Sequence, residues 1–305
     1  MARRGATGLS GVLVIDKPAG CTSHDVVARL RKATGEKRIG HTGTLDPMAT
    51  GVLIVLVGSA TRLARYLSVD RKSYLAHVEF GTATDTLDAD GDVVSSSPVP
   101  PSVLDALEAE RILATFLGPQ TQIPPAFSAI KRQGVPAYRL ARDGADVTME
   151  PRDIEVHEAA LSAIDPSGPT WQVRFSVSKG TYIRSLARDI GTVAGTDAHL
   201  SALRRTHAGA LGLEHAVTLE DACVAASDGR LPSLFIDPLP ALGFPQTTGD
   251  PASVRTGRAL PAPAGLASGS DDRVSIVVDG RLGAVYRLSG SSLVPETVFV
   301  PEVAR

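Results

Sequence analysis

The chain has 305 residues, and 43% of them are hydrophobic, which is enough to bury a core and excludes wholesale disorder. This length exceeds one typical domain and predicts a large domain followed by a small one. The two cysteines, Cys21 and Cys223, stand far apart, so they supply neither a disulfide framework nor a zinc-ligand spacing.

Membrane and secretory signals are missing from the sequence. The most apolar run, residues 52–57, is far shorter than the roughly 20 residues that a membrane-spanning helix needs. The basic start MARRGATGLS leads into no long apolar stretch of the signal-peptide kind. We therefore expect a cytoplasmic protein that does not associate with membranes.

The charge is distributed unevenly along the chain. The net charge is −2, yet residues 1–75 hold twelve Lys and Arg against five Asp and Glu, which leaves about −9 for the remainder. Segregated charge of this kind can create a face that attracts phosphates. The alternative is that these residues are ordinary solvated surface charges.

Hydrophobic spacing and turn residues divide the chain into short elements. Ser23 is a candidate cap for a helix that buries Val26, Val27 and Leu30 and ends near Gly35. The other elements expected in the first third are strands at 11–16, 52–57 and 73–80, a loop at 40–51 and a helix at 60–67.

The rest of the chain predicts further strands and helices. Thr218 is expected to cap a helix with Asp221 at its third position. A stretch rich in Gly, Ala, Pro and Ser at 246–270 is typical of a linker. The other elements expected are acidic turns at 85–92, helices at 103–117, 181–193 and 200–205, paired strands at 153–164 and 171–177, and three strands of a small module at 274–278, 283–288 and 294–300.

Several common catalytic motifs are missing. The sequence has no G-x-S-x-G elbow, no G-x-x-x-x-G-K-[ST] phosphate loop and no G-x-G-x-x-G fingerprint. Its seven histidines are scattered, without H-E-x-x-H and without a pair spaced by four residues. We therefore expect neither a metal nor a cofactor.

Asp46 is the acidic residue whose surroundings draw attention. Because Pro47 follows it, Asp46 alone would be interpreted as a capping residue at a turn or helix start. Gly40, Gly43 and Gly51 nevertheless allow backbone to approach a ligand closely. A loop of this kind between two buried strands can present one carboxylate.

The segment GHTGTLDPMATGVL resembles the catalytic-loop motif of TruB-type pseudouridine synthases. Further segments resemble the same family in the same order, and together they span about residues 8–225. These segments are GVLVIDKPAGCTSHDVV, KSYLAHVEFGTATDTLDADG, PPAFSAIKRQGVPAYRLAR, SKGTYIRSLARDIG and AHLSALRRTHAG.

The resemblance implies a mixed α/β (α+β) fold whose central sheet is mostly antiparallel. It implies a catalytic domain at 8–240 and a small C-terminal PUA-like β domain at 246–305. The implied activity is the isomerisation of uridine 55 in the T-arm of tRNA, by base flipping and exchange of the C1′–N1 bond for a C1′–C5 bond. We expect a monomer that needs tRNA as its partner and no metal.

The resemblance also assigns roles to individual residues. Asp46 resembles the essential aspartate, Arg184 the arginine paired with it, and Tyr74 the tyrosine that stacks on the target uracil. The residues that resemble substrate-binding positions are His41 at the flipped nucleotide, Lys17 in support of the site, Tyr182 and Leu203 at the uracil pocket, and Arg204 and Arg205 at phosphates.

Each assignment has a structural alternative. Tyr74 can be a core residue of an alternating strand, Arg184 a surface arginine and Lys17 a solvated turn lysine. Arg204 and Arg205 can form a solvated helix face. The role of Asp88 in DTLDADG is left open, with an Asx turn as one interpretation.

Two other function classes compete with the isomerase. A non-catalytic RNA-binding protein would use the same pocket without turnover, but it has no need for the acid, arginine and tyrosine together. A glycosidase-like hydrolase usually needs two carboxylates flanking the scissile bond, and the loop offers one. For the isomerase, Asp46 either attacks C1′ or takes a sugar proton.

Overall fold

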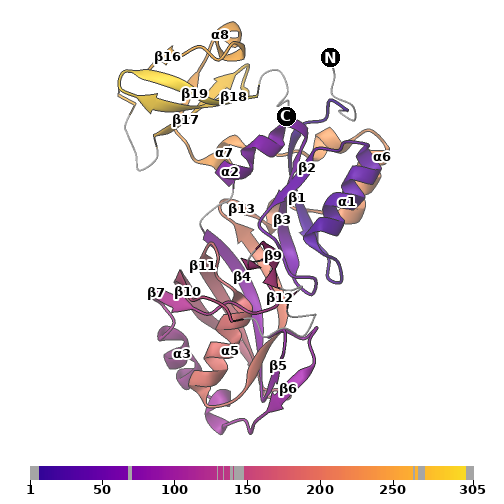
Figure 1. The fold of residues 1–305 in the computed structure, drawn as a ribbon, viewed down its shortest axis with the longest axis vertical. Coiled ribbons are helices and arrows are strands. Elements are labelled where there is room, and N and C mark those ends of the chain that lie inside the picture. The colour runs from indigo at the N-terminus through magenta and orange to yellow at the C-terminus, as the bar shows by residue number, and fades with distance from the viewer. Residues whose placement is uncertain are drawn as a thin grey trace. The chain divides into compact units, whose positions relative to one another are not determined.

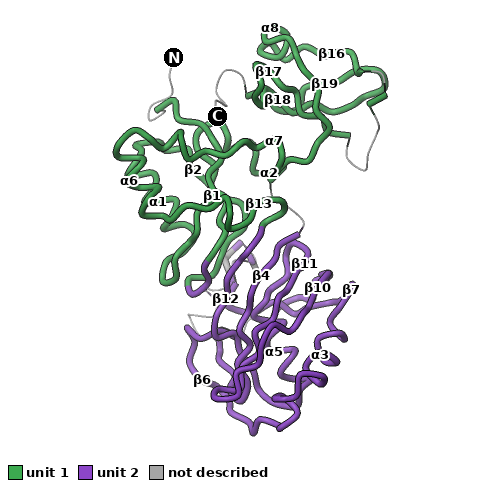
Figure 2. Tube along the Cα trace, turned by 180° about the vertical axis from the view of Figure 1, so that it is seen from behind, with its two compact units in different colours: residues 1–47, 51–69, 208–305 green, residues 48–50, 70–207 purple. Residues whose placement is uncertain are grey.

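The computed structural model describes residues 7–67, 71–128, 130–132, 134–137, 140, 148–263, 265–266 and 272–299. The chain forms two compact units (Figures 1 and 2). Unit 1 takes Met1–Pro47, Gly51–Val69 and Ala208–Arg305, and unit 2 takes Met48–Thr50 and Asp70–His207. Unit 2 is therefore an insertion between segments of unit 1.

Unit 1 begins with buried strands that pair closely. β1 (Gly11–Lys17) is antiparallel to β3 (Thr50–Val57) along its whole length and parallel to β14 (Val217–Thr218), while β2 (Ile39–Thr42) also pairs with β3. The helices α1 (Ser23–Thr34) and α6 (Leu219–Ser227) contact each other (Figure 1). The remaining short elements here are α2 (Ala64–Leu67), β13 (Leu211–Gly212), α7 (Leu239–Leu242) and 3-10 turns at Gly58–Leu63, Leu213–His215 and Leu231–Leu234.

The cap of α1 lies one residue earlier than the sequence predicts. The side chain of Thr22 accepts the N–H of Asp25, whose carboxylate accepts the Thr22 N–H in return, so the two form a capping box. Gly35 ends the helix with a φ of 69°, as expected for a left-handed C-cap. Ser23 is thereby free to use its hydroxyl elsewhere.

Two other boundaries differ from the prediction. The expected loop at 40–51 is shorter, because β2 takes up residues 40–42 by pairing His41 with Val55, and β3 already begins at Thr50. The expected helix at 60–67 is a 3-10 turn at Gly58–Leu63 followed by a single α-helical turn, α2.

The C-terminal module contains the three predicted strands, β17 (Arg273–Val278), β18 (Arg281–Ser289) and β19 (Ser292–Val298). Val300 lies outside the described residues. The expected linker at 246–270 also contains ordered elements, because pairing with β17 and β19 overrides its Gly- and Pro-rich composition. They are β15 (Gln246–Thr248), α8 (Pro251–Arg255) and β16 (Leu260–Pro261).

The module shares a core with the start of unit 1. Leu282, Val285 and Phe299 belong to the same buried cluster as Val12 and Ile54 of β1 and β3. Polar contacts add to this core, because the hydroxyl of Tyr66 in α2 lies 2.7 Å from Thr297 Oγ1. The β module therefore packs against the start of unit 1 and belongs to the same compact unit.

Unit 2 is built on five strands in the order β12-β4-β11-β10-β7. The pairs β4·β11, β11·β10 and β10·β7 are antiparallel. The helices α3 (Ala106–Ala114) and α5 (Ile183–Ala194) contact each other. The strands of unit 2 are β4 (Arg71–Phe80), β5 (Thr82–Thr84), β6 (Val93–Ser96), β7 (Gly118–Gln122), β8 (Lys131–Arg132), β9 (Val135–Pro136), β10 (Arg152–Asp165), β11 (Thr170–Ser178) and β12 (Ala198–Ala208).

The predicted fold class is confirmed. In the part of the chain that the structure describes, the larger sheet has ten strands. The strand pairs of this sheet described above are antiparallel except for β1 with β14. Helices accompany this sheet, and the C-terminal module adds a separate sheet of five strands. No helix among the described residues is long and apolar enough to cross a membrane.

The predicted helix at 200–205 is wrong, because these residues lie within strand β12. Leu, Ala and Arg favour a helix when considered locally. Pairing beside β4 outweighs that preference, and Leu203 and Arg205 alternate as buried residues with the more exposed Arg204 between them. The expected helix at 103–117 is shorter, because Asp105 caps α3 after a 3-10 turn at Pro101–Leu104.

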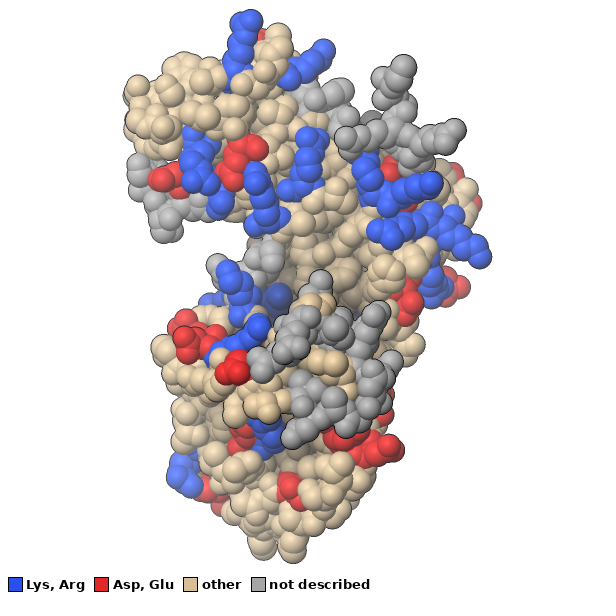
Figure 3. All heavy atoms as spheres, in the orientation of Figure 1, with Lys and Arg blue, Asp and Glu red and all other residues tan. Residues whose placement is uncertain are grey.

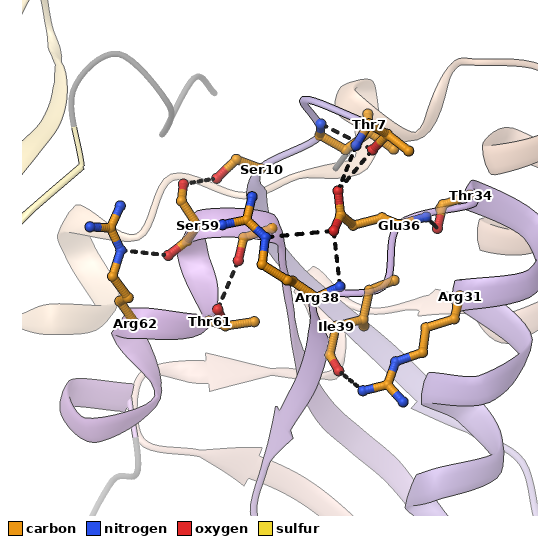
Figure 4. A network of polar contacts seen from close by, with 12 residues as sticks. Thr7, Ser10, Arg31, Thr34, Glu36, Arg38, Ile39, Ser59, Thr61 and Arg62 are labelled. Atoms are coloured by element: carbon orange, nitrogen blue, oxygen red, sulfur yellow. Dashed lines mark hydrogen bonds and ion pairs between the residues drawn. The ribbon is translucent and has the colours of Figure 1, made fainter. Parts of the chain in front are cut away.

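A buried carboxylate anchors the beginning of unit 1. Glu36 accepts hydrogen bonds from the backbone N–H and hydroxyl of Thr7 and from the backbone N–H of Arg38 (Figure 4). Burial raises the pKa of the Glu36 carboxyl, but these hydrogen bonds outweigh burial, and the pKa lies below its ordinary value. The ionised carboxylate therefore joins two segments of chain.

Replacing Glu36→Gln removes acceptor capacity from this anchor, and we expect the free energy of unfolding at pH 7 to fall by about 1 kcal/mol. Because the folded-state pKa of Glu36 is lowered, its contribution is present above the ordinary pKa and is lost as pH falls through the folded value. Urea unfolding measured between pH 7 and pH 3 should show that the free energies of unfolding of wild type and Glu36→Gln converge in acid. The exposed Glu110→Gln serves as control, and a constant difference at every pH would contradict the account.

Candidate active site

The loop that carries Asp46 is fixed on its N-terminal side by Ser23. Leu45 is buried, and its backbone N–H donates to Ser23 Oγ at 2.9 Å. The Ser23 hydroxyl donates to the carbonyl oxygen of Leu45 at 3.3 Å. Helix α1 therefore holds the residue immediately before Asp46 through both of its backbone polar groups.

The loop is fixed on its C-terminal side by Lys17, at the end of β1. The side chain of Lys17 is fully buried, and its ammonium donates to the carbonyl oxygens of Pro18 at 2.8 Å, Cys21 at 2.6 Å and Pro47 at 3.2 Å. The N–H of Gly20 also donates to Pro47 O, at 3.0 Å. A solvated turn lysine at position 17 is therefore excluded.

Asp46 itself is half-buried between these two anchored neighbours. The loop leaves β2 after Thr42 and enters β3 at Thr50, so its ends are also held by the paired strands. His41, another predicted site residue, is half-buried in β2 opposite Val55. Unit 1 thus brings together Lys17 and the loop of Asp46.

Arg184 is buried near the start of α5 in unit 2, not on the surface. Its guanidinium donates to the carbonyl oxygens of Thr86 at 2.8 Å and Phe127 at 2.9 Å, and it lies 3.2 Å from Asp88 Oδ2. Two carbonyls and one carboxylate thus fix the direction of the guanidinium plane. A solvated arginine is excluded at this position.

Asp88 is positioned by its own turn. The hydroxyl of Thr86 donates to Asp88 Oδ1 at 2.6 Å, and the N–H of Asp90 reaches the same oxygen at 3.2 Å. Leu87 before it has a φ of 63°, a left-handed conformation that is unfavourable for a leucine. The sequence DTLDADG suggests this Asx-type turn, whereas the ion pair with Arg184 is a contact that the sequence does not reveal.

The other aromatic residues of the predicted site are held by strands of unit 2. Tyr74 is 8% exposed in β4, opposite Phe175 of β11. Tyr182 is half-buried at the start of α5, and the side chain of Gln122 binds both its N–H, at 2.9 Å, and its carbonyl oxygen, at 3.1 Å. Sequence reasoning missed Gln122, because nothing in QTQIPP predicts a bond across sixty residues.

The basic pair on β12 separates into one accessible and one buried residue. Arg204 is partly exposed and donates to Thr50 Oγ1 at 3.3 Å. Arg205 is fully buried, so the interpretation as a solvated face is wrong for it. Leu203 is 7% exposed, and its carbonyl oxygen accepts from the Thr50 hydroxyl at 3.5 Å.

The described part of the site lacks the side chains of a metal centre. Among the described residues, no group of three His, Cys, Asp or Glu side chains is placed to hold a metal ion. The neighbours of Asp46 are held by an ammonium and a serine hydroxyl, and Arg184 is held by carbonyl oxygens and one carboxylate. Such groups suit the recognition and orientation of a substrate.

Comparison with known proteins decides the family. Residues 31–183 match "TruB family pseudouridylate synthase (N terminal domain)", and residues 184–234 match "tRNA pseudouridylate synthase B C-terminal domain". The tRNA pseudouridine synthase B of Syntrophotalea carbinolica is 38% identical over 97% of this chain and 94% of its own length. The chain belongs to the TruB family of pseudouridylate synthases.

Other relatives agree with this TruB family membership. The tRNA pseudouridine synthase B of Opitutus terrae is 49% identical over 70% of this chain and 86% of its own length. Among solved structures, one described as a Cbf5-Nop10-Gar1 complex superposes with a TM-score of 0.72 and 28% identity, covering 96% of this chain and 85% of that one. The prediction that this chain is an enzyme of this family is confirmed.

Replacing Lys17→Met removes three hydrogen-bond donors from the loop of Asp46 while keeping a long apolar side chain. We expect the rate of pseudouridine formation to fall by tenfold to a hundredfold, since displacing a reacting group by about 1 Å costs on that order. Single-turnover assays on RNA measure this rate. Arg111→Met, at an exposed position of α3 outside the basic surface of α1, is the control, and a Lys17→Met rate within twofold of wild type would show that the anchor does not position Asp46.

Proposed function

We propose that this protein converts uridine 55 in the T-arm of tRNA into pseudouridine, with Asp46 acting on the sugar of the target nucleotide. Relatives named tRNA pseudouridine synthase B support the tRNA substrate. The observation that carries the proposal is the clamped loop, in which Lys17 and Ser23 hold both neighbours of a half-buried acid.

The reaction needs one ionised carboxylate. The C1′–N1 bond breaks, the uracil turns, and C5 bonds to C1′; C5 then loses its proton and N1 takes one up. No atom is gained or lost and no redox change occurs. A carboxylate assists this sequence either by attacking C1′ or by accepting a sugar proton, and both roles require Asp46 without its proton.

Arg184 supplies the positive charge that favours this state. Its guanidinium is already oriented by Thr86 O, Phe127 O and Asp88. In the proposal it pairs with Asp46 when RNA is bound, and a positive neighbour stabilises the ionised carboxylate. Asp88 then acts as a positioning residue, because it holds the guanidinium and does not touch the substrate.

The target base must leave the RNA stack before Asp46 can reach its sugar. Flipping costs a few kcal/mol, and stacking on an aromatic ring returns about 1–3 kcal/mol. Tyr74 is the ring assigned to this role, with Leu203 and Tyr182 as walls of the uracil pocket. His41 is assigned to the flipped nucleotide stack and Arg204 to a phosphate.

The charge on the surface of unit 1 supports an RNA partner. Figure 3 shows Lys and Arg side chains gathered over the part of unit 1 that contains α1. Arg29, Lys32 and Lys37 are exposed there, in or just after that helix. Arg3 and Arg4 of the same basic segment lie outside the described residues.

In this proposal the enzyme acts as a cytoplasmic monomer. Residues 8–240 form the catalytic domain, and residues 246–305 form a small PUA-like domain. The five-stranded sheet of the C-terminal module supports this division.

An assay on unmodified tRNA transcript separates this function from its competitors. Conversion of uridine 55 alone, mapped by chemical sequencing, supports the isomerase. Binding without conversion would indicate a non-catalytic RNA-binding protein, and release of free uracil would indicate a hydrolase. Either of these two results would overturn the proposal.

Asp46→Asn removes the charge and keeps the size of the side chain. We expect pseudouridine formation to become undetectable while the Kd for T-arm RNA changes by less than threefold, because the carboxylate acts in the chemical step. Single-turnover kinetics and fluorescence anisotropy measure the two quantities. Asp228→Asn, at an exposed position, is the control. Asp46→Asn activity within tenfold of wild type would remove Asp46 from the chemistry, since tenfold corresponds to only about 1.4 kcal/mol of barrier.

Arg184→Lys keeps the positive charge but loses the planar fork that binds two carbonyls and a carboxylate at once. We expect the single-turnover rate to fall at least a hundredfold, with little change in RNA affinity. Arg188→Lys, one turn further along α5 and partly exposed, is the matched control. Equal losses for both variants would show that the effect comes from the helix and not from the site.

A further inference from the structure

Lys72 lies two residues before Tyr74 on β4, so the two side chains project from the same face of the strand. The register with β11 places Val177 opposite Lys72 and Phe175 opposite Tyr74. Tyr74 is almost completely buried, whereas Lys72 retains partial exposure. On this face of β4, Lys72 is therefore a charged and partly exposed neighbour of Tyr74.

Arg205 is the charged neighbour of Lys72 on the adjacent strand, β12. Because its side chain is fully buried, Arg205 offers no surface to an RNA phosphate. Burial, together with the positive charge of Arg205, lowers the pKa of the Lys72 amine to about 8. Arg205 therefore influences a ligand through Lys72 and not by direct contact.

Among the described residues, Arg205 is the charged group that acts on the pKa of Lys72. On β11, Val177 faces it, and Ser176 and Ser178 flank that valine. Arg71, next to Lys72 on β4, projects from the opposite face, where its Nε donates to Ser176 Oγ at 2.7 Å. The positive groups of Lys72 and Arg205 thus lie close together, and burial removes part of the water around the Lys72 amine.

Such an arrangement favours an anion, because a negative group would offset the repulsion between the two cations. We propose that Lys72, backed by the buried Arg205, binds one phosphodiester of the RNA next to the nucleotide that stacks on Tyr74. The inference rests on the proposed function, and it adds a titratable RNA contact to that site.

The proposed contact depends on pH. Lys72 carries its charge below its pKa of about 8 and loses it above that value, so the phosphate contact weakens as the solution becomes alkaline. Binding of the phosphate stabilises the charged form, so the complex takes up a proton when RNA binds at neutral to alkaline pH. A contact made by an arginine does not show this dependence, because arginine stays protonated.

The test measures how RNA affinity depends on salt at two pH values. The full-length protein is titrated into a T-arm hairpin that already contains pseudouridine, so that no turnover occurs, at pH 6.5 and at pH 9 over a series of KCl concentrations. Each phosphate contact contributes about 0.7 to 0.9 to the slope of log K against log salt concentration. Wild type is compared with Lys72→Gln, Lys72→Arg and the control Arg111→Gln, an exposed residue of α3.

At pH 6.5 we expect the salt slope of Lys72→Gln to be smaller than that of wild type by the contribution of about one phosphate contact. The slopes of Lys72→Arg and Arg111→Gln should match wild type. At pH 9 the wild-type slope should fall toward that of Lys72→Gln, whereas Lys72→Arg keeps its slope. If Lys72→Gln does not fold, wild type and Lys72→Arg are compared at both pH values. Equal slopes of these two chains at pH 9 would overturn the inference.

The failure of this inference is distinguishable from failure of the proposed function. A wild-type chain that converts the unmodified hairpin but shows the same slope at both pH values contradicts only the role of Lys72. A wild-type chain that neither binds nor converts the unmodified hairpin overturns both.

Discussion

The burial of the Lys17 ammonium is the constraint on which the account of the active site depends. A buried positive charge is tolerated when its N–H groups find acceptors, and Lys17 has three carbonyl oxygens within 3.2 Å. One of them belongs to Pro47, beside Asp46. Lys17 can stay buried only while the loop supplies this acceptor. The end of β1 thereby fixes the carbonyl of Pro47, thirty residues further along the chain and next to Asp46.

The same device recurs in unit 2. Arg184 is oriented by two backbone carbonyls and by Asp88, and Gln122 binds both backbone polar groups of Tyr182. The two carbonyl acceptors orient the guanidinium without adding charge, and the Asp88 carboxylate fixes it from one further side. Preorganised charge of this kind costs no reorganisation when the reaction occurs. The proposed chemistry needs one ionised carboxylate and a uracil held in place, and a rigid arrangement provides both.

The sequence predicts those parts of the fold that local patterns determine. The buried runs of β1 and β3, the paired β10 and β11, and the three C-terminal strands are confirmed, because uninterrupted or alternating apolar residues indicate strands wherever they lie. Strand β12 was not predictable in this way, because Leu203, Arg204 and Arg205 form helices readily and become a strand only beside β4. Most of the site assignments came from the family resemblance. The burial of Lys17 and the Arg184–Asp88 pair depend on contacts distant in sequence, which no local pattern contains.

The most direct measurement for the central claim is a structure of the full chain bound to T-arm RNA. The account predicts an extruded uridine stacked on Tyr74, with the Asp46 carboxylate against its C1′ and with Lys17 still bonded to the carbonyl of Pro47. A uridine that remains stacked within the RNA, or one whose sugar lies against other groups while Asp46 faces solvent, would contradict it.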